Sequence, residues 1–260
     1  MRKSFLLTTP VAALLMTVCA APVAAQDGGD YRRAEFAVGY SHARAASTFE
    51  SETALIPGEG PLTTRYCTQE GAEGFGPNFQ QFFCERKGMN GFDASATYNF
   101  SRYVGLKGNV SGHFKSDSFS DTFEVGPGET FTANVNTTER LYNFQAGVQF
   151  KDNGAGARAA RPFAHALFGV ARQTVRFRMP PSDGNSGFDA RADETSFAMK
   201  LGGGLDVRVG ERLDLRLFEF NYNPVFAGER PLAGAGITVP ITVRGRTAHN
   251  FTVGVGIVFH

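Results

Sequence analysis

The sequence has no tryptophan, only three cysteines, and no run of about 20 apolar residues outside its N-terminal region. Because a membrane helix requires such a run, any membrane crossing after that region must be made by strands. Basic and acidic residues number 26 and 25, a balance that gives no indication of a nucleic-acid partner. The abundant residues are glycine, with 31, and phenylalanine, with 25. This composition favours many short strands and turns over helices.

The N-terminus has the three parts of an export signal. Arg2 and Lys3 are followed by an apolar stretch, and the residues at 23–25 are small. The pattern predicts a signal peptide over residues 1–25 and a single domain over residues 26–260. Loss of the signal would remove two basic residues and leave a slightly negative mature chain.

The use of cysteine fits an exported chain. Cys19 lies in the predicted signal, and Val18 stands where a lipoprotein carries a small residue, so we do not expect lipidation. The remaining pair, Cys67 and Cys84, favours a disulfide, which would contribute about 3 kcal/mol in the chain-entropy model. A zinc site is the alternative interpretation, but no second cysteine pair and no nearby histidine supports it.

The C-terminal segment alternates strictly between apolar residues and small or polar ones from Asn250 onward. Side chains on a strand point alternately to opposite faces, so this segment predicts a strand with one apolar face. Its length suits a tilted membrane crossing, which takes about 9 to 11 residues. The apolar positions of this predicted terminal strand are Phe251, Val253, Val255, Ile257 and Phe259.

Earlier segments show the same period of two and bring the total to eight predicted strands. They are residues 33–42, 90–100, 104–114, 142–150, 162–172, 197–208 and 213–222, of which only 162–172 lacks a clear alternation.

The connections between these strands alternate between long and short. A soluble sandwich gives no reason for such an order, whereas an outer-membrane barrel has short periplasmic turns and long outward loops. The first long connection has no sustained period and is expected to be a loop. The connections in chain order are residues 43–88, 101–102, 115–138, 151–161, 173–194, 210–212 and 223–245.

Four segments carry local predictions. The apolar residues of 162–172 do not fall on one face, so the sequence does not assign the register of this strand. The apolar phase of the seventh strand switches near Leu217, which predicts a β-bulge. Residues 237–243 alternate and are interpreted as an early extension of the last strand. The Gly-Pro-Gly turn within residues 115–138 predicts a hairpin that continues beyond the membrane.

The polar faces of the strands carry nearly all of their charge. An arginine or lysine that faces lipid costs about 2 to 4 kcal/mol at the bilayer midplane, so we expect the apolar faces outward. The predicted fold is an all-β, eight-stranded antiparallel up-and-down transmembrane β-barrel, whose interior is just wide enough for side chains to fill. The residues expected to pair in a polar network there are Glu35, Asp93, Lys107, Lys200, Asp206, Arg216 and Glu219.

A family resemblance rests on the signal peptide, the eight alternating strands, the turn region Tyr98–Tyr103 (YNFSRY) and the C-terminal strand. Together they resemble the small outer-membrane β-barrel proteins of the OmpA transmembrane-domain, OmpX and opacity type, over residues 33–260. The resemblance implies location in the outer membrane of a Gram-negative cell. It also implies assembly by the barrel assembly machinery, which is thought to recognise a terminal aromatic residue. Here Phe259 is followed by His260, a departure from that pattern.

No catalytic or metal-binding pattern stands out. The histidines have no spacing that brings a serine and a carboxylate beside them, and no metal-ligand spacing occurs. We therefore expect no enzyme, no catalytic residue, no metal and no cofactor. A charge ladder that holds the barrel closed is the preferred interpretation of the interior residues, with a narrow channel as the alternative. A membrane-embedded lipid-modifying hydrolase is a second alternative.

Binding function is expected in the outward connections, because loops on a rigid scaffold commonly carry it. The expected contact surfaces are the first outward connection, which contains both cysteines, and the third outward connection, residues 173–194, which has mixed charge. The sequence thus predicts a barrel that acts in cell-surface interaction of the adhesion type or in envelope integrity. The expected partners are outer-membrane lipids, the assembly machinery and a surface ligand that the sequence does not identify. The chain is expected to be a monomer.

Overall fold

The computed structural model describes residues 31–46, 52–56, 60–64, 78, 81, 84–126, 129–154, 158–180, 187–228, 230–232, 241–243 and 246–260. The predicted signal peptide, residues 1–25, lies outside these ranges, and so does Cys67. Among the residues described, no helix has the length and apolar character needed to span a membrane.

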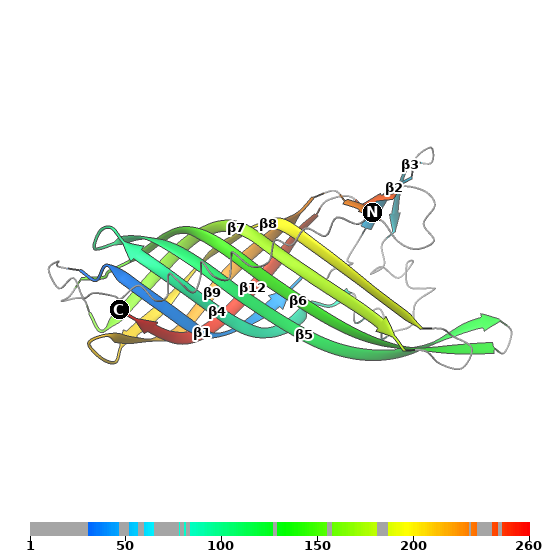
Figure 1. Cartoon of the computed structure of the whole chain (residues 1–260), viewed down its shortest axis with the longest axis horizontal. Coiled ribbons are helices and arrows are strands. Elements are labelled where there is room, and N and C mark those ends of the chain that lie inside the picture. Colours follow the sequence, from blue (N-terminus) through cyan, green and yellow to red (C-terminus); the bar gives the residue numbers. More distant parts are fainter. Residues whose placement is uncertain are drawn as a thin grey trace, which may run out of the picture. The chain divides into compact units, whose positions relative to one another are not determined.

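Eight antiparallel strands close into a barrel in the order β1-β12-β9-β8-β7-β6-β5-β4 (Figure 1). The barrel closes where β1 pairs with β12, from Phe36 opposite Phe259 to Arg44 opposite Phe251. The pairing leaves neither strand with a free edge in that segment, and it confirms the predicted fold. The strands are β1 (Ala34–Ala45), β4 (Lys87–Asn99), β5 (Val104–Gly126), β6 (Glu129–Lys151), β7 (Ala160–Met179), β8 (Phe188–Arg208), β9 (Leu213–Ala227) and β12 (Arg246–Phe259).

Burial alternates along the barrel strands with the period seen in the sequence. On β12, Val253 and Ile257 are exposed, whereas Thr252 and Val258 are buried. Apolar side chains therefore cover the outside and face lipid, as the cost of exposing charge to lipid requires. Exposed apolar residues of the other strands include Val38, Tyr40, Phe92, Tyr98, Leu106, Phe114, Phe144, Val148, Phe150, Phe168, Val170, Phe197, Leu201, Leu215, Phe218 and Phe220.

Short turns join β4 to β5 and β8 to β9 at the end of the barrel that holds the C-terminus (Figure 1). At this end the Arg102 guanidinium donates hydrogen bonds of 2.7 and 2.9 Å to the carboxylate of Asp152. The backbone N–H of Gly154 donates to the same carboxylate over 3.0 Å. The hydrogen bond from Arg102 is the main reason that the pKa of Asp152 is lowered to about 2. This Arg102–Asp152 pair ties the β4–β5 turn to the β6–β7 connection.

Four strands run past the other four at the opposite end. β5 stays paired with β6 as far as Gly126 but with β4 only as far as Phe114. β8 pairs with β7 from Phe188 but with β9 only from Phe197. The predicted hairpin is confirmed as the paired ends of β5 and β6, and residues 173–194, predicted as a connection, are largely strand. We call these extensions the outward sheet, which comprises residues 115–126, 129–140, 172–179 and 188–196.

A second sheet of four short strands has the order β10-β11-β2-β3 and comes from the first and last long connections. The expectation that residues 43–88 are a loop is wrong for β2 and β3. The interpretation of residues 237–243 as an extension of the last strand is wrong for β11, which pairs with β10 and β2 instead. Short strands satisfy their backbone groups with partners remote in sequence, which a local pattern cannot identify. The strands are β2 (Glu52–Ile56), β3 (Gly60–Thr64), β10 (Arg230–Leu232) and β11 (Ile241–Val243).

The predicted bulge lies in β9. Leu205 of β8 pairs with Phe218, and the next pair joins Asp206 to Arg216, so Leu217 has no partner on β8. Leu217 and Phe218 are both exposed on the outside of the barrel. One extra residue explains the switch of phase in the sequence, and the prediction near Leu217 is confirmed.

The unassigned register of residues 162–172 is resolved in β7. Phe163 and Leu167 are buried in the interior, whereas Phe168 and Val170 are exposed on the outside. The apolar residues of this segment therefore do occupy both faces. Alternation could not identify the inward face, because two large apolar side chains lie among the polar groups inside.

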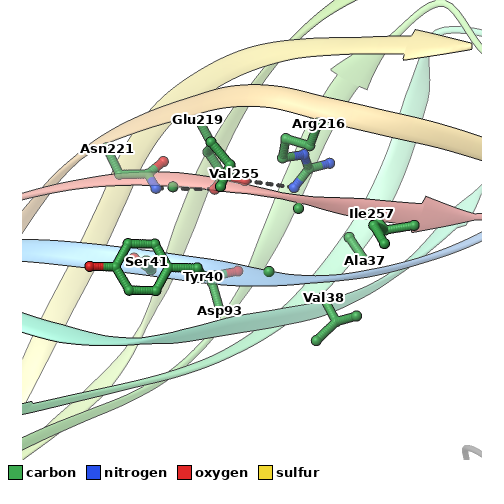
Figure 2. Close-up of a pocket in the computed structure, with 13 residues that line it drawn as sticks. Ala37, Val38, Tyr40, Ser41, Asp93, Arg216, Glu219, Asn221, Val255 and Ile257 are labelled. Carbon is green, nitrogen blue, oxygen red and sulfur yellow. Dashed lines mark hydrogen bonds and ion pairs between the residues drawn. The ribbon is translucent and has the colours of Figure 1, made fainter.

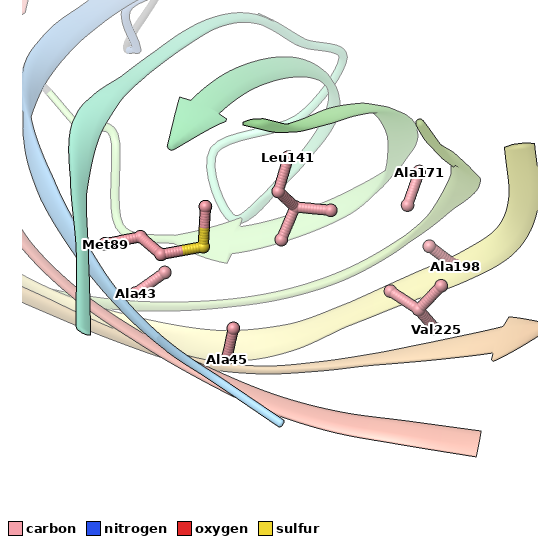
Figure 3. Close-up of a cluster of buried hydrophobic side chains, with 7 residues drawn as sticks. All are labelled: Ala43, Ala45, Met89, Leu141, Ala171, Ala198 and Val225. Carbon is pink, nitrogen blue, oxygen red and sulfur yellow. The ribbon is translucent and has the colours of Figure 1, made fainter. Parts of the chain in front are cut away.

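The interior is not polar throughout. A cluster of buried apolar side chains comes from six barrel strands, and Figure 3 shows them projecting into the ring of strands. The expectation of a polar interior is therefore incomplete, because alanine on an inward face gives no clear signal of either kind. The cluster consists of Ala43, Ala45, Met89, Leu141, Ala171, Ala198 and Val225.

Candidate functional site

A continuous chain of ion pairs crosses the barrel interior. The ammonium group of Lys151 lies 2.9 Å from the Glu35 carboxylate and 2.8 Å from that of Asp206. The guanidinium of Arg216 then joins Asp206 at 2.8 Å to Glu219 at 2.6 Å. All five residues come from different positions on β1, β6, β8 and β9, and each side chain is almost fully buried. Each charge therefore has a partner of opposite sign, as burial in a low-dielectric interior requires.

A second group lies around Lys200 on β8. Its ammonium group donates to Asp93 over 2.8 Å and to Asn109 over 2.6 Å. The amide of Asn109 in turn donates to Asp93 over 2.6 Å. The three side chains form a closed triangle that satisfies the buried lysine.

Lys107 lies beside the chain of ion pairs that runs from Glu35 to Glu219. Its ammonium group lies 3.3 Å from Nδ1 of His165, and Nε2 of the same ring lies 2.9 Å from the amide oxygen of Asn221. Asn221 donates to Glu219 over 3.0 Å, so the contacts continue into the ion-pair chain. The inward ring of Phe163 packs between cations, with the Arg216 guanidinium 4.2 Å and the Lys107 ammonium 5.3 Å from its centroid.

A small cavity lies beside this network, between β1 and β12 (Figure 2). Its lining includes Asp93, Arg216 and Glu219 together with small residues such as Gly39 and Gly256. Its volume is about 20 Å³, room for about one water molecule. Gly39 lies opposite Gly256, and a β-carbon at Gly39 would lie 2.1 Å from the Val255 carbonyl oxygen.

Ser41 and His113 form the pair closest in type to a nucleophile and a base. The Ser41 hydroxyl lies 3.0 Å from Nε2 of His113, and both residues are buried in the interior. Among the described residues, Nδ1 of His113 has no hydrogen-bond partner, so no carboxylate orients the ring. Within the described part of the chain, the pair lacks the third member of a catalytic triad.

Asp214 lies close to three basic side chains at the end of the barrel that carries the C-terminus. Its carboxylate lies 2.9 Å from Nε2 of His260, 3.2 Å from Arg161 and 3.5 Å from Arg32. The backbone N–H of His260 donates to the Arg212 carbonyl over 3.1 Å. The terminal residue is thus folded into the barrel end.

The arrangement places paired charges on both sides of a layer of apolar side chains, since the buried Lys87 and Glu139 pair beyond Met89 and Leu141. Over residues 11–259 the sequence matches the family described as outer membrane protein beta-barrel domain. The chain belongs to this family. Its membership implies an outer-membrane location, and the alternating exterior agrees with it.

The chain is also similar to solved structures of outer-membrane proteins, at low identity. OprG from Pseudomonas aeruginosa is 12% identical with a TM-score of 0.47, and the match covers 88% of this chain and 96% of that one. Ail, the attachment invasion locus protein of Yersinia pestis, is 12% identical with a TM-score of 0.42, covering 88% and 100%. Neisserial surface protein A is 11% identical with a TM-score of 0.37, covering 87% and 96%. None of the curated proteins compared with the chain matches its sequence.

The outer-membrane barrel brings together the residues predicted for its interior. Four of them, Glu35, Asp206, Arg216 and Glu219, lie in one ion-pair chain. Asp93 and Lys200 pair with each other in the second group, and Lys107 reaches the ion-pair chain through His165 and Asn221. That these contacts hold the barrel closed remains a prediction.

Several interior residues were missed by the sequence analysis. Lys151 was placed in a connection, although it continues the inward positions Gln145 and Gln149, and this parity could have identified it. Asp214 and Arg161 stand at strand ends, where alternation has too few residues to assign a face. The remaining missed polar residues include Lys87, Asn109, His113, Glu139, Asn143, His165, Asn221 and Asn223.

The terminal strand has the predicted faces. Phe251, Val253, Val255, Ile257 and Phe259 are all exposed on the outside. Recognition of this strand by the assembly machinery stays a prediction.

Cys84 is disulfide-bonded, and its predicted partner Cys67 lies outside the described residues. The pairing of the two therefore stays a prediction. Within the part of the chain that the structure describes, no group of three or more histidine, cysteine, aspartate and glutamate side chains is placed to hold a metal ion.

Proposed function

We propose that this outer-membrane barrel is a non-enzymatic protein that acts at the cell surface, in interaction of the adhesion type or in envelope integrity. The observation that carries the proposal is the outward sheet. Its four strands continue past the point where β5 stops pairing with β4 and β8 stops pairing with β9. Their ends therefore extend beyond the exposed apolar residues of the barrel exterior. They offer a surface for contact outside the membrane.

The edges of the outward sheet support a binding role. Among the described residues, β5 has a ladder partner on one side only beyond Phe114, and β8 on one side only before Phe197. Unpaired N–H and C=O groups along such an edge can pair with an extended segment of a partner. On the β5 side, the Asn78 amide already donates to the Ser120 carbonyl over 2.8 Å, so side chains of the first connection share this edge.

The contents of the barrel interior favour a structural role for the barrel over transport or catalysis. Most of its charges are in ion pairs, and Lys107 contacts His165 and the ring of Phe163. The cavity beside Arg216 holds about one water molecule, and apolar side chains fill the layer around Leu141. The buried Ser41–His113 pair lacks a carboxylate partner among the described residues. These features favour a scaffold whose function lies in its outward parts.

The test is a chain with a shortened hairpin. Residues 118–136 are removed and Asp117 is joined to Thr137, its partner across β5 and β6, by an Asn-Gly turn. Cells that make the full or the shortened chain are compared for attachment to cultured epithelial cells and for survival in bile salts.

We expect the shortened chain to reach the outer membrane with the same heat-dependent gel mobility, and to lose attachment or survival. The same attachment and the same survival in both strains would contradict the proposal. Alanine substitution of the exposed Glu211, in the turn at the other end of the barrel, is the matched control.

A further inference from the structure

Arginines cluster on the outer face of the outward sheet. All of them are exposed, and on each strand they share the face of the lipid-facing residues: Arg140 is in phase with Tyr142 and Phe144, and Arg172 with Phe168 and Val170. They therefore point away from the barrel axis. We call these residues the arginine cluster, which consists of Arg140 on β6, Arg172, Arg176 and Arg178 on β7, and Arg191 on β8.

The arginine cluster begins where the exposed apolar residues of the barrel exterior end. Phe114 of β5 lies opposite Arg140, and Tyr142 of β6 lies opposite Arg172. The rings of Phe114 and Tyr142 meet edge to face with centroids 5.5 Å apart. Aromatic girdles mark the membrane interface of outer-membrane barrels, so the first arginines stand at the level of the lipid headgroups.

The acidic residues of this face do not balance the cluster. Asp189 pairs with Arg176 at 2.5 Å, and Asp193 pairs with Arg191 at 2.8 Å. Within the described part of the chain, neither Arg140 nor Arg178 has an ion-pair partner. Arg178 lies opposite Asp189, but the ion pair of that carboxylate is with Arg176. The guanidinium groups of Arg140 and Arg178 can therefore bind an anion from outside the protein.

The strand register concentrates positive charge around Arg140. Arg140 lies opposite Thr174, so Arg172 and Arg176 are its two diagonal neighbours. Arg191 lies directly opposite Arg176. Like charges on neighbouring strands destabilise a sheet, and an anion placed between them would offset the repulsion.

We propose that the arginine cluster binds the phosphate of a lipid in the outer leaflet. A guanidinium binds phosphate through two parallel hydrogen bonds, which makes arginine well suited to this ligand. The acyl chains of the same lipid would lie along Phe114, Tyr142 and the apolar residues below them. This continuity with the lipid-facing surface selects a lipid over a soluble phosphate. The proposal does not depend on the cell-surface role of the hairpin.

The test compares lipids at the barrel surface. The mature chain is folded into phosphatidylcholine vesicles that contain spin-labelled phosphatidic acid or spin-labelled phosphatidylcholine. Electron spin resonance gives the fraction of each label that is immobilised by the protein. We expect phosphatidic acid to be enriched about fivefold for each arginine that binds its phosphate. The Arg140→Gln/Arg178→Gln variant, which breaks no ion pair, should lose most of this enrichment.

A control variant with the same change in charge is Arg158→Gln/Arg212→Gln, at the other end of the barrel, where both residues are exposed. It should keep the enrichment. Equal loss in both variants, or none in the first, would overturn the proposal, provided that heat-dependent gel mobility shows all chains folded. Loss of enrichment on addition of inorganic phosphate would also overturn it, since it would indicate a site for a soluble ion. The hairpin-shortened chain retains the cluster and should keep the enrichment even where it loses attachment.

Discussion

Arg216 and Glu219 lie three residues apart on β9, yet both side chains point into the barrel and form an ion pair of 2.6 Å. On a regular strand, residues three apart face opposite sides. The bulge places Leu217 and Phe218 outward in succession and so returns Glu219 to the interior. A local irregularity of the strand therefore positions two members of the ion-pair chain.

Removal of Leu217 should be tolerated. The deletion leaves a regular strand in which Arg216 and Glu219 still face inward, two positions apart, so the ion-pair chain can persist. Removal of Leu215, in the regular part of β9, should instead turn Asp214 or Arg216 toward lipid. An arginine there costs about 2 to 4 kcal/mol.

Gel mobility with and without boiling distinguishes the two deletions. We expect the Leu217 deletion to keep the mobility of the folded barrel and the Leu215 deletion to lose it. Equal behaviour of the two chains would show that the bulge does not set the inward faces.

The Lys200–Asp93 pair predicts an asymmetric effect on stability. Asp93→Asn leaves the fully buried Lys200 without its carboxylate, and breaking a buried pair in this way costs about 3 kcal/mol. Lys200→Met should cost less, because Asp93 is 16% exposed and keeps its hydrogen bond from Asn109. The free energy of unfolding in lipid vesicles can be measured with urea. Its loss in the double variant should be smaller than the sum of the losses in Asp93→Asn and Lys200→Met. Additive losses would contradict the pairing.

The terminal histidine should matter for stability and little for assembly. His260→Ala removes one of the side chains that contact the Asp214 carboxylate and leaves Arg161 in place, so we expect a loss of about 1 kcal/mol. Phe259 stays exposed on the outside in this variant and presents the terminal aromatic side chain. Phe259→Ala should lower the amount of folded barrel in the outer membrane more than His260→Ala does. A comparable defect in both would assign the assembly role to the last residue itself.

The Arg102–Asp152 pair predicts a change at low pH. The pKa of Asp152 falls from 3.8 to about 2 on folding, so its contribution to stability is complete above about pH 4 and is lost as the pH falls through 2. The difference in stability between the wild type and Asp152→Asn should therefore be constant at neutral pH and vanish near pH 2. A difference that vanished already at pH 5 would contradict the pairing.

The alternation of apolar and polar residues predicted most of the fold. It located all eight barrel strands and identified the outward faces of all of them except residues 162–172, because a lipid-facing residue such as Val253 must be apolar and its neighbour Thr252 is free to be polar. It also found the bulge, since one extra residue reverses the phase. It failed where lipid no longer imposes the pattern. The outward ends of β7 and β8 meet water on the outside, and β2, β3 and β11 find partners remote in sequence.

The interior was only partly predictable for a related reason. A charged residue within a clearly alternating strand, such as Lys107, could be placed inside by exclusion from lipid. Lys151 and Asp214, at strand ends, could not. Nor could the contacts themselves be predicted, because Glu35 and Lys151 meet only when the barrel closes.

Planar-bilayer recording tests the central claim, that paired charges and apolar side chains fill the barrel. The folded wild-type chain should produce no conductance steps, because a cavity of about 20 Å³ beside Arg216 admits no hydrated ion. Steps in the wild type that change in size when Lys107 or Glu35 is neutralised would contradict the account and establish a narrow channel.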